Sequence, residues 1–245
     1  LGSTHSAMGN LDQALTYYEK GLALTKELYE AYPQHVSFKN GLAISYAKLG
    51  DTHSAMGNLD QALTFFDDFS LLMKELYEAY PQNVSFKNSL AISYEKLGET
   101  HSAMGNLDQA LTFFDQRSRL GKELYEAFPQ HVSFKNGLAI SYEKLGKTHS
   151  ALGNLNQALT FFDDETILFQ ELYEAYPQNV SFKNGLAISY AKLAQFYRDN
   201  QKGNKQARDY FKQAEALWIE LVQDAPQYVE YQKNLETVRN ALKTL

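Results

Sequence analysis

The sequence contains no cysteine, only five prolines and no long apolar run. The absence of cysteine excludes disulfide bonds, thiolate metal sites and thiol catalysis. No apolar stretch reaches the roughly 20 residues that a helix needs to cross a bilayer, and no charged-then-apolar signal segment opens the chain. We therefore expect no membrane partner and take the cytoplasm as the default location.

Basic residues are also scarce relative to acidic ones. The chain has 23 Lys and Arg against 29 Asp and Glu, which gives a formal net charge of -6. A groove that follows nucleic-acid phosphates needs clustered Lys and Arg on one face, so we expect no nucleic-acid partner. The 44% hydrophobic content, with 13% aromatic residues, instead fits an ordered protein of 245 residues.

The most prominent feature of the sequence is an internal repeat. The segment THSAMGNLDQALTFF occupies residues 52–66 and returns unchanged at 100–114, with near copies from Thr4 and Thr148. Periods of 20 to 50 residues are typical of stacked units that bury their apolar faces only against neighbouring copies. The period here is 48 residues, and the repeats begin at Leu1, Leu49, Leu97, Leu145 and Leu193.

The sequence pattern within each repeat predicts two helices. Residues 58–80 contain no Gly or Pro, and their apolar side chains follow helical spacing. Asn83 is a candidate N-cap for the next helix, over 84–104, which Gly105 would terminate. The repeat unit is therefore an antiparallel helical hairpin, and the fold class is all-α.

A set of residues recurs at fixed spacing in every copy. In the second copy this set is Tyr46, Leu49, Gly50, His53, Gly57, Ala62, Phe66 and Pro81. The spacing resembles the tetratricopeptide repeat signature W-x2-L-G-x2-Y, A-x3-F, P, with Tyr for Trp, His for the second aromatic, and a longer period than the family's 34 residues. The resemblance implies a right-handed superhelical solenoid of antiparallel helix-turn-helix repeats whose helices are each about two turns longer than usual.

The repeat pattern also predicts how the chain is organised. We expect one solenoid over residues 1–245, with a partial first helix at 1–8 and a C-terminal capping helix at 228–245. Glu236 and Arg239 stand at apolar positions of that last helix, as a solvated cap requires. Because Leu1 falls in the middle of a first helix, we expect the chain to be a fragment of a longer protein.

Catalytic and metal sites are not expected. Equivalent residues of stacked hairpins lie about 8 to 10 Å apart or more, too far for histidines to share one metal. We expect these histidines to pack at the family's aromatic position, and the pairs Asp67–Asp68 and Asp163–Asp164 to face solvent. No phosphate loop or hydrolase motif is present, so we expect no enzyme activity and no cofactor. The histidines in question are His5, His53, His101 and His149.

The resemblance places a partner-binding groove along the first helix of each hairpin, where this family binds extended peptides or helices. A constant column of asparagines would pair with the backbone of a bound peptide, since an Asn amide both donates and accepts hydrogen bonds. The alternative is that these asparagines are ordinary surface or inter-helix residues. The column is Asn40, Asn88, Asn136 and Asn184; beside it lie Ile44, Ile92, Ile140 and Ile188, and the polar positions Asp51, Glu95, Glu99, Glu143, Lys147 and Gln195. A parallel lysine column, Lys48, Lys96, Lys144 and Lys192, is expected to be solvated.

The copies differ most in the second helix, after its aromatic pair. Phe69, Arg117 and Glu165 replace one another at a place where the family has a small residue. This window is either a second partner-binding surface, a region of drift, or a filling of space between the longer helices. The constant leucine column in the window is expected to serve the core; its members are Leu24, Leu72, Leu120 and Leu168.

These patterns support a protein-interaction scaffold without enzyme activity, whose partner is a protein or peptide. Two alternatives stay open. The chain could be a self-assembly module that associates through uncapped or exchanged hairpins. It could also be the regulatory arm of an enzyme whose catalytic part lies outside this sequence.

Overall fold

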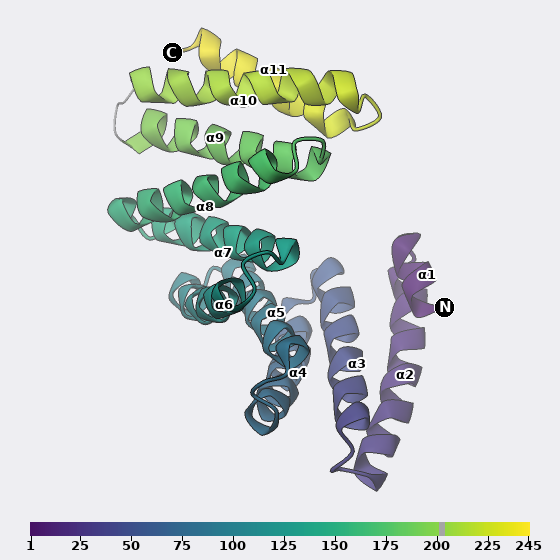
Figure 1. The fold of residues 1–245 in the computed structure, drawn as a ribbon. Helices are drawn as coiled ribbons and strands as arrows, with labels where there is room; N and C mark the ends of the chain where they lie inside the picture. The colour runs from purple at the N-terminus through teal and green to yellow at the C-terminus, as the bar shows by residue number, and fades with distance from the viewer. Residues whose placement is uncertain (201–203) are drawn as a thin grey trace. The chain divides into compact units, whose positions relative to one another are not determined.

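The computed structural model describes residues 1–200 and 204–245, and within these ranges it contains helices and no strand. Figure 1 shows helices that pair into antiparallel hairpins, which confirms the predicted all-α fold. No helix of the described residues is both long and apolar enough to cross a membrane. The helices are α1 Gly2–Ala7, α2 Leu11–Ala31, α3 Val36–Ala55, α4 Leu59–Ala79, α5 Val84–Ala103, α6 Leu107–Ala127, α7 Val132–Ala151, α8 Leu155–Ala175, α9 Val180–Asn200, α10 Asn204–Asp224 and α11 Val229–Lys243.

The helix boundaries follow the sequence prediction closely. The segments 58–80 and 84–104 become α4 and α5, shortened by one residue or two. Helix α1 lies within residues 1–8 and α11 within residues 228–245, the ranges for which the sequence predicts a partial first helix and a capping helix. Each hairpin pairs a first helix with a second helix. The complete first helices are α3, α5, α7 and α9, and the second helices are α2, α4, α6, α8 and α10.

Short polar and glycine signals set the ends of the first helices. The Asn83 side-chain oxygen accepts hydrogen bonds from the backbone N–H groups of Ser85 and Phe86, at 3.0 and 3.2 Å, as an N-cap does. At the other end of α5, Gly105 has a φ of 82°, and the following N–H donates to the carbonyl of His101. This left-handed turn favours glycine and reverses the chain into the next helix.

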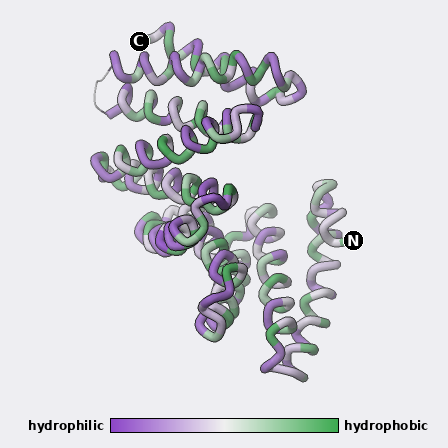
Figure 2. Tube along the Cα trace, viewed as in Figure 1, coloured by the Kyte–Doolittle hydropathy of each residue, from purple (hydrophilic) through white to green (hydrophobic). Residues whose placement is uncertain are grey.

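The chain forms two compact units, Leu1–Leu124 and Tyr125–Leu245, with the boundary in the last turn of α6. The first unit has a core that includes Phe69, Met73 and Leu90. The second has one core around Phe169 and another around Trp218. Figure 2 shows hydrophobic and hydrophilic residues interspersed along every helix, as helices that bury one face require.

Glycine at one position allows the two helices of a hairpin to approach closely. Gly50 on α3 faces the Phe66 ring of α4, and a Cβ added to Gly50 would lie 2.5 Å from Phe66 Cε1. Gly98 and Gly146 face Phe114 and Phe162 in the same way. A Cβ at this position would therefore require the Phe ring to shift from its place.

We predict that Gly50→Ala destabilises the chain by about 1–3 kcal/mol, since the added methyl group overpacks the α3–α4 contact. The matched control is Gly41→Ala on the same helix, where the nearest atom to an added Cβ is 4.0 Å away. Alanine at Gly41 should stabilise the helix by about 0.5–1 kcal/mol. Urea unfolding followed by circular dichroism separates the two variants, and equal midpoints would contradict the close-approach interpretation.

Candidate functional site

The predicted asparagine column lies on the first helices, and all four side chains are half-buried. Asn184 Oδ1 accepts a hydrogen bond of 2.9 Å from Trp218 Nε1 of α10, so Asn184 links the two helices of its hairpin. Earlier copies have Met73, Gly121 and Phe169 in place of Trp218, and none of these has a side-chain donor. Among the described residues, the other three asparagine side chains make no hydrogen bond, which leaves their amides open to a partner.

The remaining positions of the predicted stripe lie on the surface of the first helices. In the first unit, Ile44 and Ile92 are exposed large apolar residues. Asp51 is exposed and forms an ion pair of 2.9 Å with Lys96, while Glu99 is half-buried. The stripe of this unit therefore combines apolar side chains and charges on an accessible surface.

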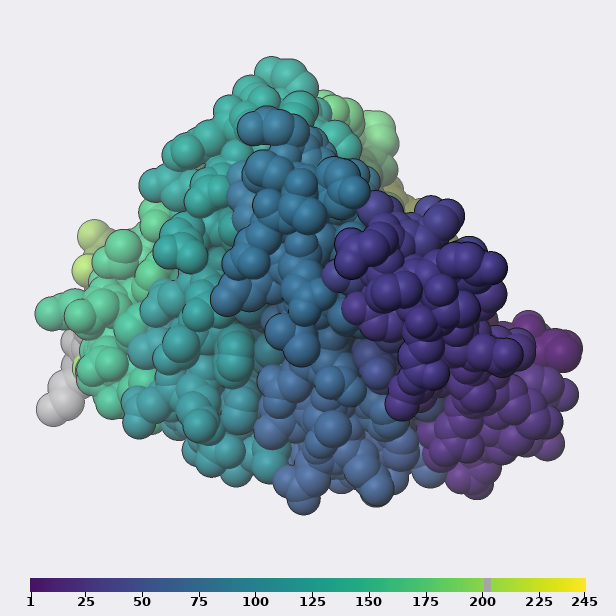
Figure 3. All heavy atoms as spheres, turned by 90° about the horizontal axis from the view of Figure 1, so that it is seen from below, coloured from purple at the N-terminus to yellow at the C-terminus, as the bar shows by residue number. Residues whose placement is uncertain are grey.

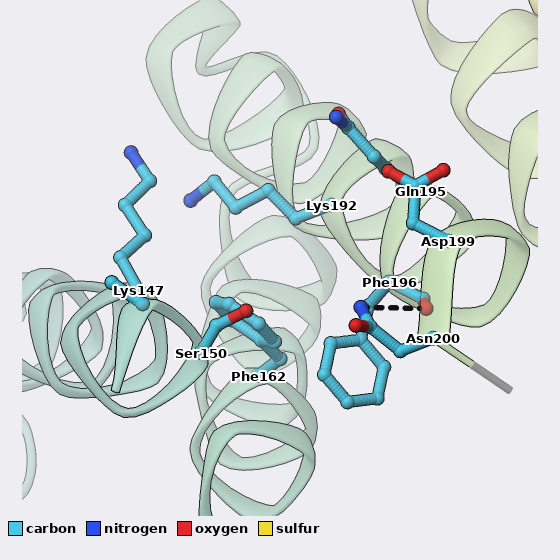
Figure 4. Close-up of a pocket in the computed structure, with 9 residues that line it drawn as sticks. Lys147, Ser150, Phe162, Lys192, Gln195, Phe196, Asp199 and Asn200 are labelled. Carbon is cyan, nitrogen blue, oxygen red and sulfur yellow. Dashed lines mark hydrogen bonds between the residues drawn. The ribbon is translucent and has the colours of Figure 1, made fainter. Parts of the chain in front are cut away.

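In the second unit, the stripe lines two cavities. The first has a volume of about 370 Å³ and lies between the C-terminal ends of α7 and α9. Figure 4 shows Lys147 and Lys192 extending toward the same region, with Gln195 and Asp199 on the adjoining wall. The second cavity, of about 470 Å³, lies where α9 meets α10 and α11. Its α9 wall consists of Ile188, Ala191, Lys192, Gln195 and Arg198.

The structure brings together two variable positions that the sequence treated separately. In the hairpin of α5 and α6, Arg117 Nε lies 2.9 Å from Glu95 Oε2. The same two positions in the hairpin of α3 and α4 hold Ala47 and Phe69, which pack in one apolar cluster. The two residues of a pair lie 22 positions apart in the sequence. The sequence analysis missed this pairing. A signal was present, because the residue at the position of Glu95 and the residue 22 positions later, at the position of Arg117, both differ between copies.

The third such pair contains two acids and recruits a lysine. Glu165 on α8 is completely buried, and its Oε1 accepts a 2.7 Å bond from Lys192 Nζ of α9. Lys192 Nζ also lies 3.0 Å from Glu143 Oε1, which accepts a further 2.6 Å bond from Lys147. Glu165 Oε2 is buried without a hydrogen-bond partner among the described residues. One lysine thus bridges two carboxylates from neighbouring helices.

The two acids of this cluster differ in their affinity for protons. Burial raises the pKa of Glu165 to about 7, although Lys192 opposes the shift. Burial would also raise the pKa of Glu143, but the charges and hydrogen bonds of Lys192 and Lys147 outweigh it and lower the pKa to about 2. Glu143 is therefore the carboxylate near neutral pH, while Glu165 titrates there.

The expected solvation of the lysine and aspartate positions is only partly met. Lys192 is largely enclosed, and Lys96 forms an ion pair, so a plainly solvated lysine column is wrong for these two. Asp163 and Asp164 are half-buried, and burial raises the pKa of Asp163.

The divergent window lies mostly inside the protein. Phe69, Arg117 and Glu165 are all buried, and Phe69 is part of the core, which is the space-filling alternative. Leu71 and Ile167, in the same window, are instead exposed. The leucine column is buried at Leu72, Leu120 and Leu168. The expectation that it serves the core is wrong for its first member, Leu24, which is 64% exposed.

The histidine column packs on aromatic rings. His53 stacks on Phe65 with ring centroids 5.4 Å apart, and His101 and His149 stack on Phe113 and Phe161. This is the packing predicted for the family's aromatic position. Within residues 1–200 and 204–245, no cluster of His, Asp and Glu could hold a metal ion.

Comparison with known proteins agrees with this architecture. Residues 1–68 match the tetratricopeptide repeat family. Solved structures with the same fold include BtubC (BKLC) from P. vanneervenii, at 14% identity and a TM-score of 0.62, over 96% of this chain and 90% of that one. A putative kinesin light chain of Podosopora anserina with nearly identical TPR-like repeats has 17% identity and a TM-score of 0.60, over 90% and 92%. The apo form of RapI has 15% identity and a TM-score of 0.60, over 100% and 82%. No curated protein matches the chain in sequence.

We predict that Glu165→Gln alters the pH dependence of stability. The folded pKa of about 7 lies above the ordinary 4.5, so the folded chain holds more protons than the unfolded chain between these values. The contribution of Glu165 to the free energy of unfolding therefore falls as pH rises from about 4.5 to about 7. Glu165→Gln removes this decline, and the variant gains stability relative to the parent across that window.

The matched control is Glu143→Gln. The folded pKa of Glu143 is about 2, below the ordinary 4.5, so its contribution grows as pH rises from about 2 to 4.5 and is constant above. Urea midpoints measured from about pH 4.5 to 7.5 compare the variants. Parallel curves for the parent and Glu165→Gln would show that Glu165 is not the titrating group.

Proposed function

Because the chain is built from tetratricopeptide-type helical hairpins, we propose that it is a non-enzymatic scaffold that binds an extended peptide or helix of another protein along its first helices. Proteins of this repeat family are typically non-catalytic, and the structural neighbours of this chain have the same hairpin architecture. The binding surface we propose is the stripe of exposed and half-buried side chains on α3, α5, α7 and α9.

The observation that carries the proposal is the cavity between α9, α10 and α11. The stripe assigned to α9 from the sequence supplies one of its walls, through Ile188 and Gln195. Its volume of about 470 Å³ falls in the range of natural ligand pockets, which combine apolar walls with a few polar groups. Phe211 and Val238 supply further apolar wall, so one side chain of a bound peptide would be enclosed there.

The open asparagine amides provide the second part of the proposed recognition. Asn88 and Asn136 are half-buried, and neither side chain has a partner among the described residues. A peptide backbone presents both donors and acceptors, so an Asn amide can pair with it whatever the peptide sequence. The variable residues beside them, Glu95, Glu143 and Gln195, would then select among peptide side chains.

We predict that the double variant Asn88→Ala/Asn136→Ala loses most of its partner binding and keeps its helicity. Each lost hydrogen bond costs about 0.5–1.5 kcal/mol, so two together weaken binding by about tenfold. The matched control is Gln109→Ala/Gln157→Ala, which removes exposed amides of the same chemistry from the second helices. Affinity capture from the native lysate, followed by binding assays with the identified partner, compares the two variants.

Equal capture by both double variants would remove the first-helix stripe from consideration. If the parent captures only further copies of itself, self-association replaces peptide binding as the better account of the chain.

A further inference from the structure

The cavity between the C-terminal ends of α7 and α9 is lined by residues at which α9 departs from the repeat. Phe196 and Asp199 stand at positions that hold threonine and alanine in the earlier copies. The Phe196 ring meets the Phe162 ring of α8 edge-on, with centroids 5.9 Å apart, so the two rings form an apolar part of the lining. The earlier residues are Thr52, Thr100 and Thr148, and Ala55, Ala103 and Ala151.

The lining of this cavity also carries positive charge. Lys147 of α7 and Lys192 of α9 both line it, and Figure 4 shows the two side chains extending toward the same region. The acid among the lining residues is Asp199, which forms a 2.7 Å ion pair with Arg198. The cavity therefore presents two ammonium groups together with one carboxylate that an arginine already neutralises.

The two ammonium groups share a single well-ionised partner. Glu143 Oε1 accepts a 2.6 Å hydrogen bond from Lys147 and lies 3.0 Å from Lys192 Nζ. An ammonium group has three donors. Lys147, whose side chain is 57% exposed, makes no other hydrogen bond or ion pair with the described residues. Donors of Lys147 thus remain for a ligand in the cavity.

The second acid of the cluster, Glu165, is the group that changes charge near neutral pH. It lies on α8, which packs closely against α7 (teal to green in Figure 3), and its side chain is completely buried. The charged groups that face Glu165 are Glu143 and Lys147 of α7 and Lys192 of α9. Burial raises the pKa of Glu165 to about 7, and its Oε2 has no hydrogen-bond partner among the described residues. When Glu165 holds a proton, two ammonium groups face one carboxylate.

We propose that this cavity binds an acidic side chain of the peptide, and that Glu165 takes up a proton from solvent when the peptide binds. The peptide carboxylate then replaces the charge of Glu165 beside Lys147 and Lys192, and the cluster stays neutral. Lys192 and Gln195 also line the larger cavity of α9, α10 and α11, so the acidic residue lies beside the side chain enclosed there. This inference rests on the proposed peptide binding, to which it adds the chemistry of one peptide residue and a dependence on pH.

Proton uptake fixes the sign of that pH dependence. The form of the chain with a protonated Glu165 is the one that binds, so the affinity is greatest below about pH 7 and falls as pH rises above it. At pH 7 about half of the free chains hold this proton. Binding at that pH should therefore take up about half a proton per peptide.

The test uses the complete chain and a phage library of random peptides, selected on the immobilised chain at about pH 6. The selected peptides are synthesised with amidated C-termini, so they have no terminal carboxylate, and peptides that contain histidine are left out. We expect them to share an Asp or Glu next to an apolar residue. General attraction would not produce this result, because the chain itself has a formal net charge of -6.

Isothermal titration calorimetry in buffers of different ionisation enthalpy then counts the protons taken up. The parent should take up about half a proton at pH 7 and bind up to about tenfold more weakly at pH 8 than at pH 7. Glu165→Gln should take up none and keep the same affinity at both pH values. Replacing the acidic residue of the peptide by its amide should abolish the proton uptake.

Variants of the chain locate the binding site. Lys147→Met should weaken peptide binding about tenfold, because a hydrogen bond between charged groups is lost, and the variant keeps its fold since Lys147 is exposed. The matched control is Lys212→Met on α10, an exposed lysine outside the lining of the cavity, which should bind like the parent.

Three results would overturn the proposal: selected peptides without a shared acidic residue, equal proton uptake by the parent and Glu165→Gln, or equal binding by Lys147→Met and Lys212→Met. If such peptides still lose affinity for Asn88→Ala/Asn136→Ala, the first-helix stripe binds peptides and only the acidic site is wrong. If the library yields no peptide at all, both the acidic site and the proposed peptide binding are wrong.

Discussion

The array depends on the contact between each first helix and two leucines of the second helix, which in α4 are Leu72 and Leu76. In α4, α6 and α8 these leucines are almost completely enclosed, and each enclosed leucine contributes about 1.5–3 kcal/mol through burial of apolar surface. The glycines opposite Phe66, Phe114 and Phe162 serve the packing of the same hairpins, because they let the backbones of neighbouring helices approach closely. The equivalent residues of α2, Leu24 and Leu28, are exposed.

The interior of each hairpin is less uniform than the sequence identity of the copies indicates. One pair of facing positions holds the apolar residues Ala47 and Phe69 in the hairpin of α3 and α4. In the hairpin of α5 and α6 the same positions hold Glu95 and Arg117, which form an ion pair. In the hairpin of α7 and α8 they are two acids held by Lys192 from the next helix. Some of the positions that vary between copies, and that the sequence suggested as a binding surface, therefore make contacts inside the hairpins. Part of the stripe on the first helices, including Ile44 and Ile92, remains exposed.

The sequence predicted the helices well because their signals are local. Gly105, Asn83 and the absence of Gly and Pro from 58–80 define boundaries that no distant residue alters. The paired positions could not be predicted in the same way, since contact across a hairpin depends on how each helix is rotated about its axis. Asn184 illustrates this limit: its role depends on Trp218, 34 residues away, which the other copies lack. The exposure of Leu24 was missed for the same reason, because a constant leucine indicates core whether or not a helix covers it.

The different internal pairs affect which first helix packs against which second helix when the nearly identical hairpins fold. A chain of interchangeable copies could fold with the first helix of one copy against the second helix of another. Such an exchange would set Glu95 against Phe69, or Arg117 against Ala47, and would separate the ion pair that Arg117 forms with Glu95. An uncompensated buried charge is more costly than the pair it replaces. The three pairs thus act as labels that distinguish one copy from the next, and they give a repetitive chain a fixed order of assembly.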